Sequence, residues 1–325
     1  MKKIKLISTG GTIAMGENKE GKLIPKFTGK ELIESIPELE EMCEVEVNEF
    51  CNIDSSQMTP ERMFKLAQLV KEEIRNSDID GIVITHGTDT LQETAYMLNV
   101  LIDSSKPVII TGAMRGATEL GSDGSANIYQ AFKVAVKEKS KDQGVLVVLN
   151  NEIHTAHLLT KRHTTNLAAF RSTNSGRLGE VTKEEVNYFY KTMPPKNIKT
   201  DAINTKVAFV KIVSGFNSTI IDMLVSNNEF DGLIIEAFGS GTIPNYILPS
   251  LERALNKGMK VVLTSRCLEG KVHNTYAAAG GDKDLEEMGV IFSDGISGPK
   301  ARIKLMLLLG GDYKDEEICD FFKEA

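Results

Sequence analysis

The sequence has no tryptophan, only four cysteines and no long hydrophobic run. A membrane-spanning helix needs about 20 consecutive apolar residues, and no stretch approaches that length. The N-terminus reads "MKKIKLISTGG", in which two lysines precede an apolar stretch too short for the core of a signal peptide. We therefore expect a cytoplasmic protein with no membrane partner, although a chain whose signal had been cleaved would show the same pattern.

The four cysteines do not form a metal-binding or disulfide pattern. Cys43, Cys51, Cys267 and Cys319 share no CxxC spacing and have no histidine pattern beside them. HExxH-type helices are also absent from the sequence. We expect free thiols in a reducing compartment and no metal site.

Clustered positive charge is absent as well. The formal net charge is −7 at an isoelectric point near 5.5, and the basic residues are scattered along the chain. Nucleic-acid binding needs a clustered basic surface, so we expect no nucleic-acid partner. The 325 residues, 41% hydrophobic and 26% charged, suit two compact globular domains or one large one.

Short β-branched runs alternate with helix-like segments along the whole chain. This alternation predicts an α/β fold with right-handed crossovers and a largely parallel sheet. Residues 191–206, with two prolines and few apolar residues, are the predicted linker. The linker would join a larger N-terminal α/β domain, residues 1–190, to a smaller C-terminal α/β domain, residues 207–325. Within the first domain the predicted strands are 4–7, 45–50, 81–85, 107–111 and 144–150.

Two predicted helices carry recognisable start signals. In "TPERMFKLAQLVKEEI", Thr59 is the expected N-cap and Pro60 the first helical residue. The apolar face of this helix would consist of Met63, Leu66, Ala67, Val70 and Ile74. In the helix that follows strand 81–85, Thr90 and Glu93 are predicted to form a capping box.

Four polar loops follow four of the predicted strands: "STGGT", "NIDSSQ", "HGTDT" and "GAMR". Parallel strands end at the same edge of a sheet, so these loops should line one pocket. The glycine pair matches neither GxGxxG nor a Walker loop, which weakens a nucleotide-binding interpretation. Gly10 and Gly11 could equally form only a sharp turn, and Thr90 could act only as a cap. His86 is given no catalytic role.

The loops carry the groups that acyl transfer requires. Thr12 and Thr88 offer hydroxyls, Asp89 a carboxylate and Lys161 an amine. A threonine hydroxyl is a weak nucleophile until a neighbouring base takes its proton, and a neutral lysine can be that base. Backbone N–H groups of glycine-rich turns can stabilise an oxyanion. These residues predict hydrolysis or acyl transfer on a small polar substrate by a threonine nucleophile.

Motifs along nearly the whole chain resemble those of the bacterial-type L-asparaginases, in the asparaginase/glutaminase family. The likeness rests on "TGGTIA" at 9–14, "DSSQMTPE" at 54–61, "ITHGTDTLQETAY" at 84–96, "GAMR" at 112–115, "SDGSANIYQA" at 122–131 and "TKRHTTNLAAF" at 160–170. It implies hydrolysis of L-asparagine to L-aspartate and ammonia, without a cofactor, through a threonine acyl-enzyme. It also implies a homotetramer built as a dimer of dimers.

The resemblance assigns a role to each candidate residue. Thr12 would be the primary nucleophile, and Thr88, Asp89 and Lys161 the second catalytic cluster. The residues that would hold the substrate are Ser55, Ser56, Gly87, Thr88, Asp89 and Ala113. The C-terminal domain of a neighbouring subunit would complete each site, with "GSGT" at 239–242 as the expected contributor.

One departure from the family pattern concerns the loop after "TGGTIA". The family usually has a tyrosine there that helps to activate the first threonine, whereas "MGENKEGKLIPKFTG" contains none. Phe27 has no hydroxyl to offer. Tyr276, contributed by a neighbouring subunit, is one candidate replacement. The glycines and charges of the loop still suit a lid that closes over substrate.

Three other functions remain open at this stage. A dual glutaminase–asparaginase would differ little, because one methylene is worth only ~1–3 kcal/mol of discrimination. A non-catalytic amino-acid sensor could use the same pocket. The amidotransferase subunit that corrects misacylated transfer RNA has a related core, but this function is disfavoured because the sequence shows neither the expected additional N-terminal domain nor a basic surface.

Overall fold

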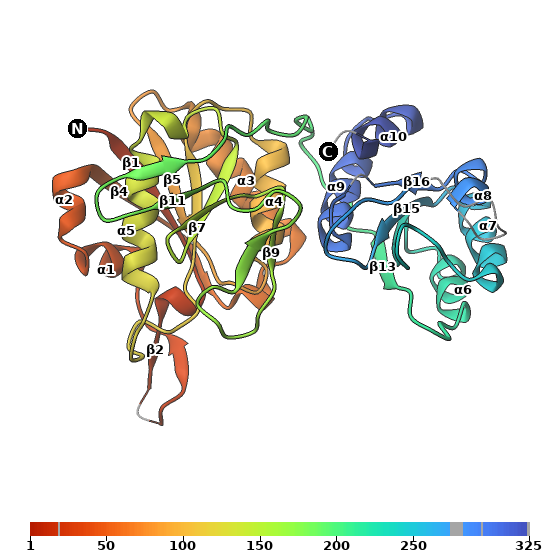
Figure 1. Cartoon of the computed structure of the whole chain (residues 1–325), viewed down its shortest axis with the longest axis horizontal. Helices are drawn as coiled ribbons and strands as arrows, with labels where there is room; N and C mark the ends of the chain where they lie inside the picture. The colour runs from red at the N-terminus through yellow and green to blue at the C-terminus, as the bar shows by residue number, and fades with distance from the viewer. Residues whose placement is uncertain (19, 274–281, 294, 324–325) are drawn as a thin grey trace. The chain divides into compact units, whose positions relative to one another are not determined.

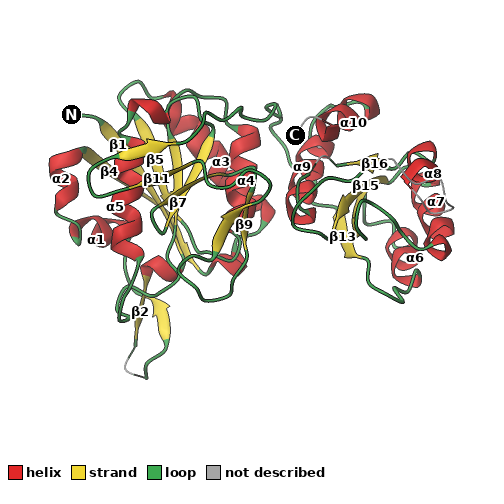
Figure 2. Ribbon diagram, in the orientation of Figure 1, coloured by secondary structure: helices red, strands yellow, loops and turns green. Residues whose placement is uncertain are grey.

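The computed structural model describes residues 1–18, 20–273, 282–293 and 295–323. The chain divides into two compact units, residues 1–197 and 198–325. Each unit has its own sheet with helices around it, so the predicted α/β class is confirmed (Figures 1 and 2). The division falls within residues 191–206, which form neither helix nor strand.

The first unit is built on an eight-stranded sheet with the order β12-β11-β8-β7-β6-β5-β1-β4. Five of these strands are parallel, as the alternating pattern predicts. They are β1 (Lys3–Gly10), β4 (Glu44–Ile53), β5 (Gly81–Thr85), β6 (Val108–Thr111) and β7 (Val145–Leu149).

The other three strands are antiparallel and were not predicted. They are β8 (Glu152–Thr155), β11 (Gly179–Val181) and β12 (Val186–Tyr188). The chain reverses between β7 and β8 through Asn150 and Asn151, whose φ angles are +50° and +63°. Asparagine tolerates this left-handed region, and two such residues form the tight turn that a hairpin needs. A separate small hairpin, β9 (Leu159–Lys161) with β10 (Phe170–Ser172), lies beside this edge.

Helices cover both faces of the sheet. On one face lie α3 (Pro60–Arg75) and α4 (Leu91–Leu101); on the other lie α1 (Gly29–Glu34), α2 (Glu38–Met42) and α5 (Gly124–Ala135). The predicted start of α3 is confirmed, although the side chain of Thr59 makes no capping hydrogen bond. The predicted apolar face of α3 is also confirmed, because all five of its residues are buried.

The predicted capping box at Thr90 and Glu93 is wrong. Thr90 is the N-cap of α4, but its hydroxyl donates to the Ser55 carbonyl at 2.8 Å and makes no capping bond. The tertiary contact to the neighbouring loop has replaced the local one. A capping box does form at α1, between Thr28 and Glu31.

A hairpin projects from the first unit below the sheet in Figure 1. It consists of β2 (Met15–Glu17) and β3 (Leu23–Pro25). Two hydrogen bonds tie β2 to the loop after β6: Ala117 N–H donates to the Met15 carbonyl at 2.8 Å, and Glu17 N–H donates to the Thr118 hydroxyl at 2.9 Å. The hairpin is therefore anchored at its base.

The second unit has a four-stranded parallel sheet in sequence order. Its strands are β13 (Val207–Lys211), β14 (Gly232–Ala237), β15 (Lys260–Ser265) and β16 (Ile291–Phe292). Its helices are α6 (Thr219–Ser226), α7 (Leu248–Asn256), α8 (Asp282–Glu287), α9 (Gly298–Gly310) and α10 (Asp315–Lys323). Over the described residues of both units, every helix is too short or too polar to cross a membrane. All four cysteines carry free thiols.

Candidate active site

The candidate site lies at the carboxyl ends of the parallel strands in the first unit. The chain passes from β4, on one side of β1, to β5 on the other, so the strand order reverses between β1 and β5. Such a reversal opens a crevice at the carboxyl edge of a parallel sheet. The loops after β1, β4, β5 and β6 meet there.

Gly10 and Gly11 end β1 in a backbone conformation that only glycine adopts readily. Their φ angles are +89° and +82°. A Cβ atom on Gly11 would lie 2.2 Å from the Cα atom of Gly87, and one on Gly10 would lie 2.5 Å from the backbone nitrogen of Ile53. The glycine pair therefore lets the loop after β1 pack directly on the backbone of its two neighbours.

Thr12 follows this pair as the first residue of a short 3-10 turn, Thr12–Ala14. The turn buries Ile13 and Ala14 and leaves Thr12 half-buried. Within the described residues, the Thr12 hydroxyl is not engaged in a hydrogen bond with another side chain or carbonyl.

Thr88, Asp89 and Lys161 form a connected cluster. Lys161 Nζ lies 2.8 Å from Thr88 Oγ1 and 2.6 Å from Asp89 Oδ1. The side chain of Lys161 is 17% exposed and Thr88 is buried, whereas 64% of the Asp89 side chain is exposed. A charged lysine donates to both oxygens, while a neutral one can accept the hydroxyl proton of Thr88 and still donate to Asp89. The cluster can thus move a proton on or off Thr88.

The backbone around Lys161 is held from two sides. Lys161 is the last residue of β9 and pairs with Phe170 of β10. Its backbone N–H donates to Gln92 Oε1, in the first turn of α4, at 3.0 Å. Gln92 has no role predicted from the sequence; its position within "HGTDTLQ", one turn after the polar loop, is the signal that could have identified it.

Ser55 connects the loop after β4 to the loop after β5. Its hydroxyl accepts from Asp89 N–H at 3.2 Å, and a Cβ on Gly87 would lie 2.6 Å from that hydroxyl oxygen. Ser56 is exposed, and its N–H donates to Asp54 Oδ1 at 2.8 Å. The two serines therefore lie at the same crevice, one buried between loops and one facing solvent.

His86 supports the loop after β5 through two hydrogen bonds made by its ring. It is completely buried, and burial lowers its pKa to about 4. Because the Gly87 carbonyl can only accept, Nδ1, 2.7 Å away, carries the ring proton. Nε2 then accepts from the Thr94 hydroxyl at 2.9 Å. His86 is therefore a neutral residue whose two hydrogen bonds join the loop after β5 to α4.

The loop after β6 contributes buried Ala113 and is organised by two residues without a predicted role. The Asp123 carboxylate accepts from the N–H groups of Met114 and Arg115 at 3.0–3.1 Å. Asn127 Nδ2 donates to the Gly112 carbonyl at 2.9 Å. Asp123 and Asn127 both lie in the motif "SDGSANIYQA" at 122–131, which is their only sequence signal.

The remaining predicted contributors lie elsewhere. The Phe27 ring packs against the hydrophobic core of the first unit. Tyr276 lies outside the described residues. Residues 239–242 belong to the second unit, where Phe238 and Thr242 pair across a tight turn. In the part of the chain that the structure describes, no group of three or more His, Cys, Asp or Glu side chains is arranged to hold a metal ion.

Comparison with known proteins links both units to one family. The family model "Asparaginase, N-terminal" matches residues 3–194, and "Glutaminase/Asparaginase C-terminal domain" matches residues 206–322. The chain is 33% identical to the L-asparaginase of Bacillus licheniformis over 97% of both sequences. It is 34% identical to a glutamyl-tRNA(Gln) amidotransferase subunit of Pyrococcus abyssi, over 97% of this chain and 74% of that one. The crystal structure of a probable cytoplasmic L-asparaginase from Campylobacter jejuni has a TM-score of 0.89 at 31% identity, with both chains fully covered.

Proposed function

Because the chain belongs to the asparaginase family, we propose that it hydrolyses L-asparagine to L-aspartate and ammonia through an acyl-enzyme intermediate on a threonine. The observation that carries this proposal is the Thr88–Lys161–Asp89 cluster beside the Gly11–Gly87 contact. Two hydroxyls, of Thr12 and Thr88, thereby flank one crevice. Simple binding would not need a lysine in contact with one of them.

In the proposed reaction, the Thr12 oxygen attacks the side-chain amide carbon of asparagine. The C–N bond breaks, the amide nitrogen takes a proton and leaves as ammonia, and an aspartyl ester remains on Thr12. Water then attacks the ester, which releases aspartate and restores the hydroxyl. Thr88, Asp89 and Lys161 would supply and remove the protons, and backbone N–H groups near Gly87 and Ala113 would stabilise the oxyanion.

The loops after β4 and β5 carry the side chains that would hold the amino-acid end of the substrate. Ser55, Ser56 and Asp89 present hydroxyls and a carboxylate at the same crevice. We propose that the hydroxyls bind the α-carboxylate of asparagine and that Asp89 binds its α-ammonium group. The charge on Asp89 would then be shared between Lys161 and the substrate.

Isosteric removal of each hydroxyl tests the proposed mechanism. Thr12→Val and Thr88→Val should each lower kcat for ammonia release by roughly 100-fold or more, as expected for a nucleophile or a proton-transfer group. In a second experiment, wild-type enzyme quenched with acid during turnover should carry an aspartyl adduct that mass spectrometry detects. Thr182→Val is the matched control, since the hydroxyl of this exposed threonine bonds locally, to the Glu185 carbonyl and N–H. Full activity in Thr12→Val, with no adduct on residue 12 in the wild type, would rule out Thr12 as the nucleophile.

Two alternatives use the same pocket and are separated by simple assays. Equal kcat/KM for L-glutamine and L-asparagine would indicate a dual glutaminase–asparaginase. Binding of asparagine by calorimetry without any ammonia release would indicate a sensor. Neither outcome changes the family.

One further candidate function is that of a subunit in a glutamyl-tRNA(Gln) amidotransferase, as in the Pyrococcus abyssi relative. Its identity to this chain, 34%, is close to the 33% of the L-asparaginase relative. Failure of the purified chain to act on free asparagine, together with activity on addition of a misacylated transfer RNA and partner subunits, would favour that function. Turnover of free asparagine by the chain alone supports asparaginase.

We also propose that the enzyme is a cytoplasmic homotetramer that uses no cofactor. The Campylobacter jejuni relative is called a probable cytoplasmic enzyme, which supports the compartment. In this assembly, residues 239–242 of one subunit would complete the site of another.

A further inference from the structure

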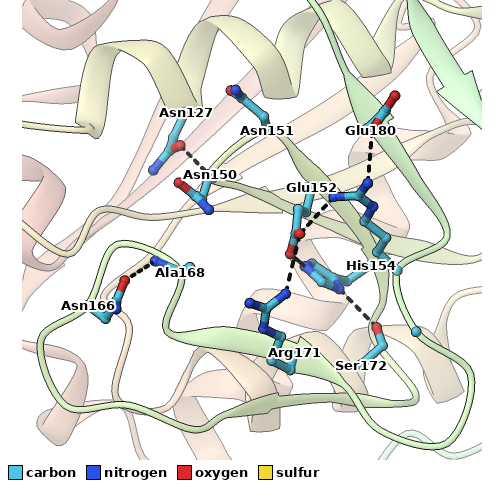
Figure 3. Close-up of polar contacts among 12 residues, drawn as sticks. Asn127, Asn150, Asn151, Glu152, His154, Asn166, Ala168, Arg171, Ser172 and Glu180 are labelled. Atoms are coloured by element: carbon cyan, nitrogen blue, oxygen red, sulfur yellow. Dashed lines mark hydrogen bonds and ion pairs between the residues drawn. The ribbon is translucent and has the colours of Figure 1, made fainter.

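A cluster of charged and polar side chains surrounds the buried residues Glu152 and His154 of β8, outside the proposed catalytic groups (Figure 3). His154 is 1% exposed, with Nε2 at 3.3 Å from Glu152 Oε2 and Nδ1 at 2.9 Å from Ser172 Oγ. Glu152 also forms ion pairs with Arg177 at 3.0 Å and with Arg171 at 3.5 Å. Glu152 and His154 lie two residues apart on one strand, so they point to the same face.

The charges of this cluster fix the direction of its hydrogen bonds. The hydrogen bond with His154, supported by the two arginines, lowers the pKa of the Glu152 carboxyl to about 2, so this group is ionised at neutral pH. A carboxylate only accepts, and therefore Nε2 of His154 carries a proton. Nδ1 of the same ring shares a hydrogen bond with the Ser172 hydroxyl. The imidazole thus joins β8 to β10.

The hydrogen-bonded strands extend this connection to Lys161. In the β9–β10 hairpin, Ser172 lies opposite Leu159, and Phe170 lies opposite Lys161. Beyond that pair, Arg162 N–H donates to the Ala169 carbonyl at 2.7 Å. A hydrogen bond that holds Ser172 of β10 in place therefore also restrains β9, the strand that carries Lys161.

We propose that His154 and Ser172 are positioning residues for Lys161: the Glu152–His154–Ser172 connection holds the β9–β10 hairpin at the register that keeps Lys161 Nζ in contact with Thr88 and Asp89. The proposal rests on the proposed function for its effect on catalysis. The structural part of the proposal, that His154 and Ser172 anchor the β9–β10 hairpin, does not depend on which reaction the site performs.

The test is the Ser172→Ala variant, which removes the bond to His154 and leaves the catalytic groups in place. A hydrogen bond of this kind is worth about 1 kcal/mol, so kcat should fall about fivefold, with a smaller change in KM. Amide hydrogen exchange in residues 159–172 should become faster by a similar factor.

Ser140→Ala is the matched control. Ser140 is a buried serine of the same unit, and its hydroxyl bonds to the Val134 carbonyl and to Tyr188 Oη, both at 2.6 Å. Ser140→Ala removes the same hydroxyl oxygen, but from a site whose hydrogen bonds do not involve the β9–β10 hairpin. Both kcat and hydrogen exchange in 159–172 should stay at wild-type values.

A double-mutant cycle with Lys161→Met separates positioning from general destabilisation. If Ser172 acts through Lys161, Ser172→Ala should have no further effect on kcat once Lys161 is replaced. The inference is overturned if the two effects multiply, or if Ser172→Ala matches Ser140→Ala in both kcat and exchange. A wild type that releases no ammonia, or a fully active Lys161→Met, contradicts instead the proposed function, and the exchange measurement then decides the anchoring alone.

Discussion

Gly11 and Gly258 have the same φ angle, +82°, but different surroundings. A Cβ on Gly11 would collide with the backbone at Gly87, whereas a Cβ on Gly258 would meet nothing within 4 Å. The two positions therefore separate the cost of backbone strain from the cost of close packing.

We expect Gly11→Ala to lower the free energy of unfolding by about 3–5 kcal/mol and to abolish activity, because strain and overpacking add. Gly258→Ala should cost only about 1–2 kcal/mol and leave kcat unchanged. Urea unfolding and ammonia release measure both effects. Equal destabilisation by the two variants would show that the loops can move apart without cost.

His86 should make stability depend on pH. Its folded-state pKa of about 4 lies below the ordinary value of 6.5, so the unfolded chain binds this proton more readily. The stabilisation is complete above pH 6.5 and is lost as the pH falls towards 4, by up to about 1.4 kcal/mol per pH unit. His86→Asn should show a correspondingly smaller slope in urea unfolding over the same pH range. Identical slopes would mean that His86 does not titrate on unfolding.

At this scale, the motifs predicted which reactive side chains would lie together, but a single sequence carries no signal for the contacts that hold them in place. Thr88, Asp89 and Lys161 lie in compact motifs, and they are in contact. The supporting contact of Gln92 joins residues 69 positions apart. Thr90 illustrates the same limit, because a contact to Ser55 replaced the cap that its local sequence favoured.

Among the elements, the β2–β3 hairpin is the one whose anchoring can be tested directly. Thr118→Val removes the acceptor of the Glu17 N–H and should loosen the hairpin. If the hairpin closes over substrate, KM for asparagine should rise about 2–10-fold, with a smaller change in kcat, as expected from losing one hydrogen bond.

The same Thr182→Val variant provides the comparison for this change, since both threonines are exposed. Thr118→Val with an unchanged KM would argue against a role of the hairpin in closing the site.

Parallel strands and long helices could be predicted because their apolar residues recur with a clear period. The three antiparallel strands at the β12 end of the first unit's sheet could not. β11 and β12 have only three residues each, too few to establish an alternation. β11 pairs with β8 and β12 pairs with β11, and only the folded sheet supplies these partners.

For the whole molecule, the proposed shared site predicts complementation between subunits. A chain with Thr12→Val keeps residues 239–242, and a chain with Ser240→Ala and Thr242→Val keeps Thr12. Each alone should be inactive, whereas tetramers mixed from both should recover up to about a quarter of wild-type activity at statistical mixing. Mixed assemblies are isolated by two different affinity tags. No recovery in verified mixed tetramers would place the complete site within one chain.

At the scale of the whole chain, residues 191–206 are the predicted linker because their composition differs from that of the segments on either side. Pro194 and Pro195 lie close to the observed division at residues 197 and 198. How subunits would share a site depends on surface complementarity, for which a single sequence carries no periodic signal.

The contact between Gly11 and Gly87 has a consequence for changing substrate preference. Thr12 and Thr88 each follow directly on a backbone segment that touches the other, so main-chain contact limits how closely these segments approach. Substitutions in the core behind the sheet cannot bring them nearer. In the proposed asparaginase reaction, a change of substrate preference depends instead on the walls of the crevice, such as the loop after β6, and directed-evolution libraries are best concentrated there.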